Sequence, residues 1–267
     1  MQTVKYFGTD GIRGTYGNYP MTEEFMTRLG YAVGTVLGHD ADAINEQPIV
    51  IIGRDTRQSG PGLQQALTRG LTATGAIVWD LGILPTPGVA FLTQEHQATA
   101  GVVISASHNP AEQNGIKFFS RQGTKLSLEQ ELEIESILDA TALENVPAMD
   151  ESKVFDRLDL QADYLRDLLA SQHELNLNGK RILVDCSNGA AYRLAPRALE
   201  ILGADIVPIN IDSSGDTINK NAGSERARSK PAELAAIMQE KGADLAIAFD
   251  GDADRVIFLD ELGRLID

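Results

Sequence analysis

Short apolar runs alternate with stretches of helical periodicity along almost the whole chain. The clearest runs lie at 48–52, 101–104, 181–186 and 244–249, and turn residues bound each of them. Continuous runs of this kind are typical of strands that are covered on both faces, and their alternation with helices is typical of largely parallel sheets. The sequence therefore predicts the α/β class, with mostly parallel mixed sheets flanked by helices in three layers.

Two similar domains of this kind are predicted, at residues 1–150 and 151–267. Between 140 and 153 the periodicity fades and Pro147 interrupts it, which is typical of a domain boundary. A chain of 267 residues is long enough for two domains of ordinary size. Glycine suits the residue that ends a helix, and Gly-Ala pairs between a helix and a strand recur at 75–76, 203–204 and 242–243. This recurrence favours a similar build in both domains.

Apolar spacing and end signals place the individual elements. In the first domain, helices are predicted at 21–37, 60–74 and 127–138 and in a short segment ending near 94, and strands at 48–52, 76–79, 101–104 and 116–119. In the second domain, helices are predicted at 156–169, at 190–202 and from 231 onward, and strands at 181–186, 205–210 and 244–249. Ser127 and Gln130 have the spacing of a capping box.

The composition argues against several classes of protein, including those that bind nucleic acid and those that span a membrane. The formal net charge is −15, which argues against nucleic acid and anionic membranes as partners. No apolar run approaches the roughly 20 residues of a membrane helix, and the first residues lack the apolar core of a signal peptide. The single cysteine, Cys186, lies in an apolar run where a buried thiol is expected, and it allows no disulfide within the chain. A cytoplasmic protein is therefore expected.

The most distinctive loop follows the apolar run at 101–104. It runs from Ser105 to Pro110, Ser-Ala-Ser-His-Asn-Pro, and presents two hydroxyls and an imidazole beyond the carboxyl end of a buried strand. Ligands of open α/β sheets bind in the crevice at such strand ends. Asn114-Gly115 is predicted to turn the chain, because both residue types tolerate positive φ. The return would bring Lys117 beside the hydroxyls.

A glycine-rich segment at 7–14 reads Phe-Gly-Thr-Asp-Gly-Ile-Arg-Gly. Its glycines allow the backbone to approach a ligand closely, and Arg13 is the cation that the segment presents. An ordinary glycine turn with a solvated arginine explains these eight residues equally well.

Several other polar residues leave open choices. Arg54 and Arg57 could form a phosphate-binding pair, but a structural salt bridge is at least as well supported by the sequence. Asp10 and Asp185 are expected to be N-cap or turn acceptors rather than ligands.

Three carboxylates alternate in the loop after the last apolar run, at Asp250, Asp252 and Asp254. They would repel one another unless a cation neutralised them, and their hard oxygen ligands suit Mg²⁺, Mn²⁺ or Ca²⁺. Arg255 adds a forked donor that suits phosphate oxygens. The spacing, with Glu261, resembles an EF-hand loop, but Arg255 occupies the position that requires glycine, and apolar strands flank the loop. A solvated acidic turn is less favoured, because strand ends of α/β sheets are ligand sites.

A serine next to a histidine raises the question of serine hydrolysis. The serine lies in no Gly-x-Ser-x-Gly elbow, and adjacent residues of an extended strand point to opposite faces. Ser107 and His108 are therefore not expected to form a nucleophile–base pair. A serine that faces a divalent ion among cations fits phosphoryl transfer better, because the cations neutralise the charge on the transferred group.

Taken together, segments 7–14, 105–110 with 114–119, and 250–255 resemble the motifs of the α-D-phosphohexomutase family. The three motifs stand in the family's order, and the match spans the whole chain. The first two are most similar to bacterial members that act on glucosamine phosphates. The resemblance implies interconversion of glucosamine 6-phosphate and glucosamine 1-phosphate, a step of amino-sugar metabolism toward peptidoglycan precursors.

The resemblance also implies roles for individual residues. Ser107 would be the phosphoserine that gives its phosphoryl group to a phosphosugar substrate and retrieves it through a 1,6-bisphosphate. Asp250, Asp252 and Asp254 would hold one Mg²⁺, with an oxygen on Ser107 as a further ligand. The remaining residues would steer the phosphoryl group, bind substrate phosphate or assist proton transfer, and these are Arg13, His108, Lys117 and Arg255.

Two features depart from the family pattern. Residues 111–113, Ala-Glu-Gln, stand where the family usually has an aromatic and an acid, which leaves the rigidity of the loop open. The family has four domains, whereas this chain ends at Asp267, so the resemblance implies a two-domain fragment with negligible turnover alone. Residues 256–266 would then open a third domain, and their exposed edge could pair with another chain in a homodimer.

Two other functions stay open from the sequence. Phosphoglucomutase or phosphomannomutase activity would differ only in the sugar accepted, and the family's sugar-recognition loop is absent from this chain. A non-catalytic interaction module that carries phosphoserine would keep its cellular function in Ser107→Ala.

Overall fold

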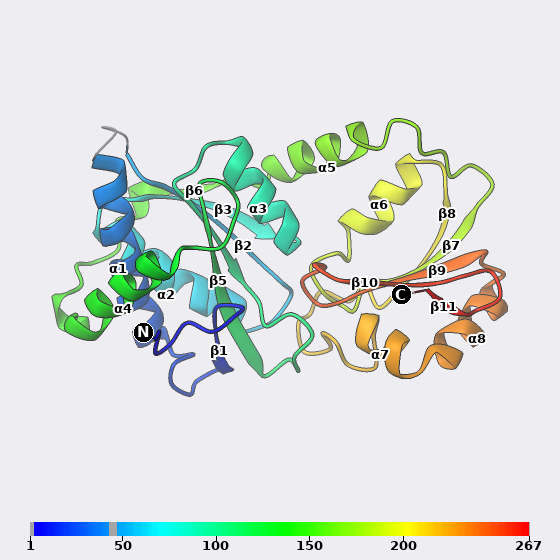
Figure 1. Cartoon of the computed structure of the whole chain (residues 1–267), viewed down its shortest axis with the longest axis horizontal. Coiled ribbons are helices and arrows are strands. Elements are labelled where there is room, and N and C mark those ends of the chain that lie inside the picture. The colour runs from blue at the N-terminus through cyan, green and yellow to red at the C-terminus, as the bar shows by residue number, and fades with distance from the viewer. Residues whose placement is uncertain (1–2, 43–46, 267) are drawn as a thin grey trace.

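The protein forms two α/β units that lie side by side along its long axis (Figure 1). The structure is a computed structural model, and it describes residues 3–42 and 47–266. The chain begins in the first unit and ends in the second, as the colours from blue to red show. Two mixed sheets flanked by helices confirm the predicted fold class.

The first sheet is mixed and has six strands. In spatial order these are β1 (Ile12–Thr15), β5 (Gln113–Ser120), β4 (Ala100–Ile104), β2 (Ile49–Arg54), β3 (Ile77–Ile83) and β6 (Val154–Asp156). The central strand β2 pairs in parallel with β3 and β4, and β3 pairs in parallel with β6. β5 runs antiparallel to β4 and β1.

Helices cover both faces of the first sheet. One face packs in a common apolar cluster with α1 (Glu23–Asp42), α2 (Gly60–Ala73) and α4 (Leu128–Ala140). The other face packs against α3 (Thr86–Glu95) and the start of α5 (Leu160–Ala170). Two short 3₁₀ turns, Leu143–Asn145 and Glu151–Lys153, precede β6.

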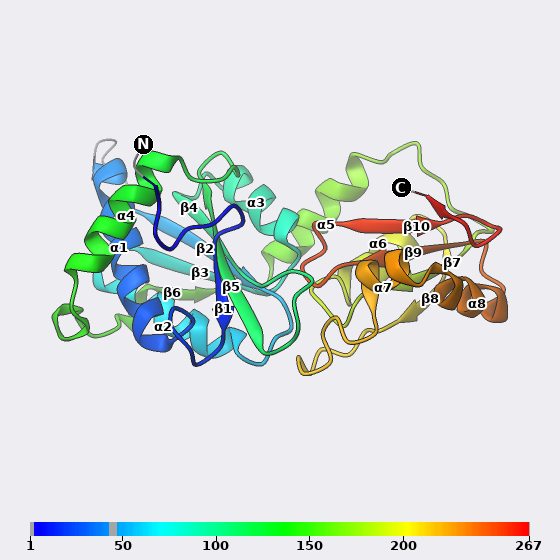
Figure 2. The same cartoon turned by 60° about the horizontal axis from the view of Figure 1, so that its bottom comes forward.

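The second sheet has five strands. In spatial order these are β11 (Leu265–Ile266), β10 (Val256–Leu259), β9 (Leu245–Phe249), β7 (Arg181–Asp185) and β8 (Asp205–Ile209). One face packs against α7 (Gly223–Ser229) and α8 (Pro231–Lys241), which come forward in Figure 2. The other face packs against α6 (Leu194–Ile201). Cys186, directly after β7, is fully buried as expected.

Local signals for helix ends are confirmed. Gly75, Gly203 and Gly242 all have positive φ, between +61° and +99°. Ser127 and Gln130 form the predicted capping box, in which each side chain bonds the other residue's backbone N–H. Among the described residues, no helix combines the length and apolarity needed to span a bilayer.

Two strand pairings bear on the predicted domain boundary and on the predicted start of a third domain, both of which stay predictions. β6 pairs with β3, so the first sheet continues to Asp156, past the predicted boundary at 150/151. A three-residue strand is too short to show periodicity in the sequence. β10 pairs antiparallel with β9, so the hairpin predicted to open a third domain is continuous with the second sheet. Only the six residues 250–255 separate β9 from β10, so the two strands pair as neighbours in sequence.

Some element boundaries also differ from the sequence expectations. The predicted helices at 156–169 and 190–202 begin at Leu160 and Leu194, because β6 and a turn occupy their expected first residues. β1 and α7 were not predicted. Both lie in glycine-containing segments without clear apolar spacing.

Candidate functional site

The serine loop, residues 105–112, connects the carboxyl end of β4 to β5. The Ser105 hydroxyl is buried, donates to Asp55 Oδ2 (2.6 Å) and accepts a hydrogen bond from the Ser107 N–H (2.9 Å). Ser107 has a φ of +54°, a left-handed conformation that is uncommon for residues other than glycine. Ser107 is therefore not extended, so the opposite-face argument against a pair with His108 does not hold for it. Its hydroxyl nonetheless pairs with an acid of the second unit.

Asn114 and Gly115 lie within β5 and do not form the predicted turn. They pair with Gly14 and Arg13 of β1, and the turn is made earlier, within the serine loop. A Cβ at Gly115 would lie 2.7 Å from the Ser105 carbonyl oxygen. Glycine is thus required there for the close approach of neighbouring backbone, which the sequence alone does not distinguish from a turn.

Arg57 holds the serine loop from inside the first unit. Its guanidinium donates to the carbonyl oxygens of Ser107 (3.0 Å), Asn109 (2.8 Å) and Gln113 (2.9 Å), and also to that of Pro110. It also pairs with Asp55 (2.9 Å), and both side chains are fully buried. Burial raises the pKa of Asp55, while the charge of Arg57 acts to lower it. Of the two roles open from the sequence, Arg57 therefore has the structural one, a buried salt bridge.

Asn219 holds the same loop from the second unit. Its side-chain amide donates to the carbonyl oxygens of Ser107 and Asn109, at 2.8 Å each. Asn109 of the loop donates to Oε1 of Gln113, the first residue of β5 (2.8 Å). The unusual residues at 111–113 therefore lie at the end of a loop that many hydrogen bonds hold in place. No sequence signal marked Asn219, because its role depends entirely on the packing of the two units.

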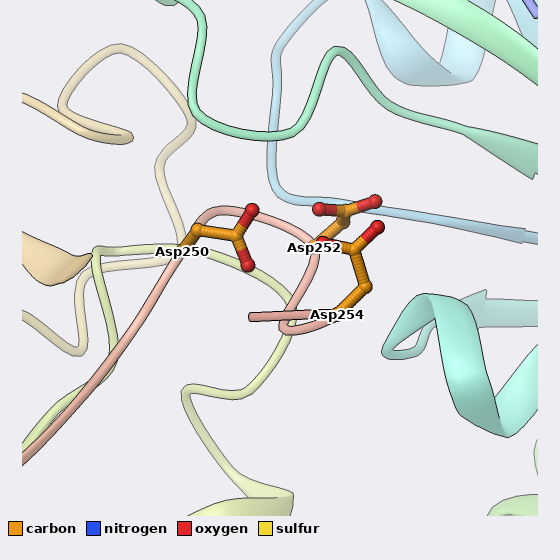
Figure 3. A group of neighbouring side chains, drawn as sticks. All are labelled: Asp250, Asp252 and Asp254. Atoms are coloured by element: carbon orange, nitrogen blue, oxygen red, sulfur yellow. The ribbon is translucent and has the colours of Figure 1, made fainter. Parts of the chain in front are cut away.

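The acidic loop, residues 250–255, connects β9 to β10 at the edge of the second unit that faces the serine loop. One oxygen from each of Asp250, Asp252 and Asp254 lies within 4.8 Å of the others (Figure 3). The first two side chains are buried, and that of Asp254 is 34% exposed. The three residues come from one turn, so the predicted acidic cluster is present.

The two loops meet across the boundary between the units. Ser107 Oγ donates to Asp250 Oδ2 at 2.6 Å, although the two residues are 143 positions apart in sequence. One terminal nitrogen of Arg255 donates to both, at 2.5 Å to Ser107 Oγ and 2.7 Å to Asp250 Oδ2. A Cβ at Gly251 would lie 2.4 Å from the Ser107 carbonyl oxygen, so the backbones are also close.

Lys117 projects from β5 to the acidic loop. Its Nζ lies 2.9 Å from Asp252 Oδ2 and 3.1 Å from Asp254 Oδ2. Burial acts to lower the pKa of Lys117, but the two carboxylates outweigh it and raise that pKa. The lysine is thus a fixed cation within the acidic cluster that Ser107 also contacts.

His108 contacts the other cation of the site. Its Nδ1 lies 2.5 Å from the terminal nitrogen of Arg255. A guanidinium only donates, so Nδ1 accepts this bond and the proton of the neutral ring belongs on Nε2. Burial and the charge of Arg255 lower the pKa of His108, which favours this neutral form.

Arg13 stands apart from these direct contacts. It lies in β1, and its terminal nitrogen is 3.5 Å from Asp10. Its Nε is buried and, among the described residues, has no hydrogen-bond partner. Its charge contributes to the lowered pKa of His108. Asp10 is therefore an ion-pair partner rather than a cap, whereas Asp185 accepts the Ser187 N–H (2.9 Å) as a turn acceptor.

The pKa values of the two buried acids shift in opposite directions. Burial and the charges of the other two acids raise the pKa of Asp250 to about 6. Burial acts to raise that of Asp252 as well, but Lys117 and the Thr86 hydroxyl, which donates at 2.6 Å, lower it overall. The second oxygen of Asp252, Oδ1, is buried and has no partner in the described part of the chain. A buried, anionic and unpaired oxygen within an acidic triad fits a hard cation such as Mg²⁺.

Comparisons with known proteins show the family of this chain. The family model "phosphoglucomutase/phosphomannomutase, alpha/beta/alpha domain I" matches residues 4–145, and that of domain II matches residues 162–263. Phosphoglucosamine mutase of Polynucleobacter asymbioticus is 49% identical over 98% of this chain and 57% of its own length. The enzyme of that name from Deinococcus radiodurans is 46% identical over 100% and 58%.

A solved structure shows the same architecture. It is a phosphoglucomutase/phosphomannomutase family protein from Burkholderia thailandensis, 26% identical, with a TM-score of 0.78 over 98% of this chain and 56% of that chain. This chain thus spans just over half the length of the relatives that it matches. Its two α/β units, and the motifs that they bring together, make it a member of the phosphoglucomutase/phosphomannomutase family.

Proposed function

We propose that the protein acts as a phosphoglucosamine mutase, which interconverts glucosamine 6-phosphate and glucosamine 1-phosphate through phosphoserine at Ser107. The relatives of that name are 46–49% identical across nearly the whole chain. The observation that carries the proposal is the 2.6 Å contact between Ser107 Oγ and Asp250, made between two units and surrounded by cations. A surface serine would need none of these partners.

Asp250, Asp252 and Asp254 would hold one Mg²⁺, together with an oxygen on Ser107. The unpaired Oδ1 of Asp252 supports this assignment. When bound, the ion neutralises charge on the transferring phosphoryl group.

The chain's own cations complete the proposed site. During transfer the bond between Ser107 Oγ and phosphorus breaks while a sugar hydroxyl bonds to phosphorus, and the proton that this hydroxyl loses ends on the Ser107 oxygen. The second half of the cycle reverses this at the other end of the bisphosphate. Arg255 neutralises the serine oxygen that leaves, and Lys117 stays protonated beside the acids. His108, with Nδ1 occupied, offers Nε2–H to a phosphoryl oxygen, and Arg13 adds positive charge for the substrate phosphate.

The activity is assigned to the whole protein, because the chain spans 57–58% of its curated relatives. We expect the 267 residues alone to bind the ion and carry the phosphoserine with negligible turnover. A cytoplasmic location, a homodimer and the absence of nucleic-acid or membrane partners stay predictions from the sequence.

A coupled assay on the full-length protein tests the proposal. Glucosamine 6-phosphate is expected to be used at least tenfold faster than glucose 6-phosphate or mannose 6-phosphate. Ser107→Ala should abolish the activity, whereas Ser120→Ala, a surface serine bonded to Thr124, should keep it. A preference for another sugar would reassign the substrate, and an active Ser107→Ala enzyme would contradict the phosphoserine itself.

A further inference from the structure

A second pocket lies between the two units, and none of the residues of the phosphoserine site line it. Its volume is about 220 Å³. Its lining runs from the end of β2 through α5 to the turn before α6, and includes Arg54, Gly82, Leu158, Gln161, Tyr192 and Arg193. Both units and the helix between them therefore contribute to one small cavity.

The two arginines of this pocket have no carboxylate partner. Arg54 makes one long hydrogen bond, from its terminal nitrogen to the Asp55 carbonyl oxygen at 3.5 Å. Arg193 donates to Gln161 Oε1 at 3.0 Å. Within the described part of the chain, no Asp or Glu lies within 4.0 Å of either guanidinium, and none lines the pocket. Arg54 is half-buried and Arg193 is exposed.

The other arginines at the unit boundary are neutralised. Arg57 pairs with Asp55, and Arg255 pairs with Asp250. Two guanidinium groups that share one cavity repel each other, and a dianion between them would remove that repulsion. The forked donors of arginine match the oxygens of a phosphate group. Arg54 is also the last residue of the central strand β2, and ligands of α/β sheets bind at such strand ends.

We propose that this pocket binds a phosphate group, either inorganic phosphate or the phosphate of a small ester. Arg54 holds the anion from the first unit and Arg193 holds it from the second. The cavity is smaller than the roughly 300–1,000 Å³ of pockets for larger ligands, which suits a ligand of this size. The bound anion contacts both units, and it therefore stabilises the relative position of the two units seen in this structure. The site does not depend on the mutase activity.

Amide NMR shifts of the intact chain during titration with inorganic phosphate test the site directly. Saturable shifts are expected at the pocket amides of Gly82 and Tyr192. Arg54→Met and Arg193→Met should each raise the dissociation constant at those amides at least tenfold, and Arg54→Lys should raise it less. Arg197→Met is the matched control, because this exposed arginine of α6 is paired with Glu200 (3.6 Å) and should leave binding unchanged.

The amides of the serine and acidic loops report the phosphoserine site separately in the same spectra. A second titration with glucosamine 6-phosphate shows whether the pocket prefers the ester or the free anion, and saturation by either supports the proposal. Absence of saturable shifts at Gly82 and Tyr192 would overturn it. So would equal binding by folded Arg54→Met and Arg193→Met variants, whose far-UV circular dichroism matches that of the unchanged chain.

Discussion

At Ser107, three local features combine to aim one hydroxyl. The residue has a left-handed backbone, and its N–H donates a hydrogen bond to the Ser105 hydroxyl. The side-chain amide of Asn219 donates hydrogen bonds to the carbonyl oxygens of Ser107 and Asn109. Its Oγ then meets Asp250 and Arg255 together. A hydroxyl between an acid and a guanidinium is preorganised for an added phosphoryl group, because the cation is in place before the charge arrives.

The unpaired Oδ1 of Asp252 predicts that this residue is a metal ligand. Asp252→Asn is expected to weaken Mg²⁺ binding at least about tenfold, because it removes a buried anionic ligand. Isothermal titration of the chain with MgCl₂ measures this. Asp216→Asn, at an exposed acid of another loop, is the control and should bind Mg²⁺ like the unchanged chain. Equal affinity in Asp252→Asn would remove this residue from the metal site.

Among the elements, strands β4, β5 and β1 carry most of the first unit's share of the site. β4 delivers the serine loop, β5 returns Lys117 to the acids, and β1 packs Arg13 against β5. These strands lie close together because glycine replaces larger residues where their backbones meet. A Cβ at Gly11 would lie 2.1 Å from the Ile116 carbonyl oxygen of β5.

A comparison of Gly11→Ala with Gly17→Ala distinguishes the stability lost through close packing from the stability lost through backbone strain. Both glycines have positive φ, +86° and +83°, but a Cβ at Gly17 would meet nothing within 4 Å. Each alanine costs roughly 1–2 kcal/mol for the left-handed backbone. Gly11→Ala should cost about 1–3 kcal/mol more, because it also forces the strands apart. Urea unfolding measures the difference, and equal losses would refute the packing argument.

The segment after β2 supplies the buried pair that supports the serine loop. Arg57→Met leaves the Asp55 charge buried without a partner and removes donors from the loop carbonyls. Loss of one partner of a buried pair is expected to lower the free energy of unfolding by about 3–5 kcal/mol. Arg166→Met, which breaks an exposed pair with Asp163, should lower it by less than about 1 kcal/mol. Similar small losses in both variants would show that Arg57 is not a structural support.

For the whole molecule, the site exists only where the two units meet. The acids come from the second unit and the serine from the first, and Gly251 lets their backbones approach. Gly251→Ala should therefore separate the loops without unfolding either unit. A displacement of this kind is expected to lower the activity of the full-length enzyme about a hundredfold. Gly242→Ala, where a Cβ has open space, is the control. Full activity in Gly251→Ala would mean that this contact does not matter.

The sequence predicts the parts of this architecture that are local. Alternating apolar runs reveal the α/β class, and glycine at helix ends marks real C-terminal caps. Strand-end loops also point to Ser107 and the three acids, which the structure brings together, because ligands of α/β sheets bind at such strand ends.

What the sequence misses depends on distant partners. The role of Asn219 requires the second unit to lie against the first, and Arg57 holds carbonyls about fifty positions away. Asn114-Gly115 has the composition of a turn, yet pairing with β1 draws it into a strand. The strand β6 is too short to carry a pattern of its own.

The central claim is that the hydroxyl held between the two units is the one that carries the phosphoryl group. Intact-protein mass spectrometry after incubation with glucosamine 1,6-bisphosphate and Mg²⁺ tests it most directly. One added phosphoryl group is expected on the unchanged chain and on Ser120→Ala, and none on Ser107→Ala. A folded Ser107→Ala protein that still gains the group, or an unchanged chain that never does, would contradict the account.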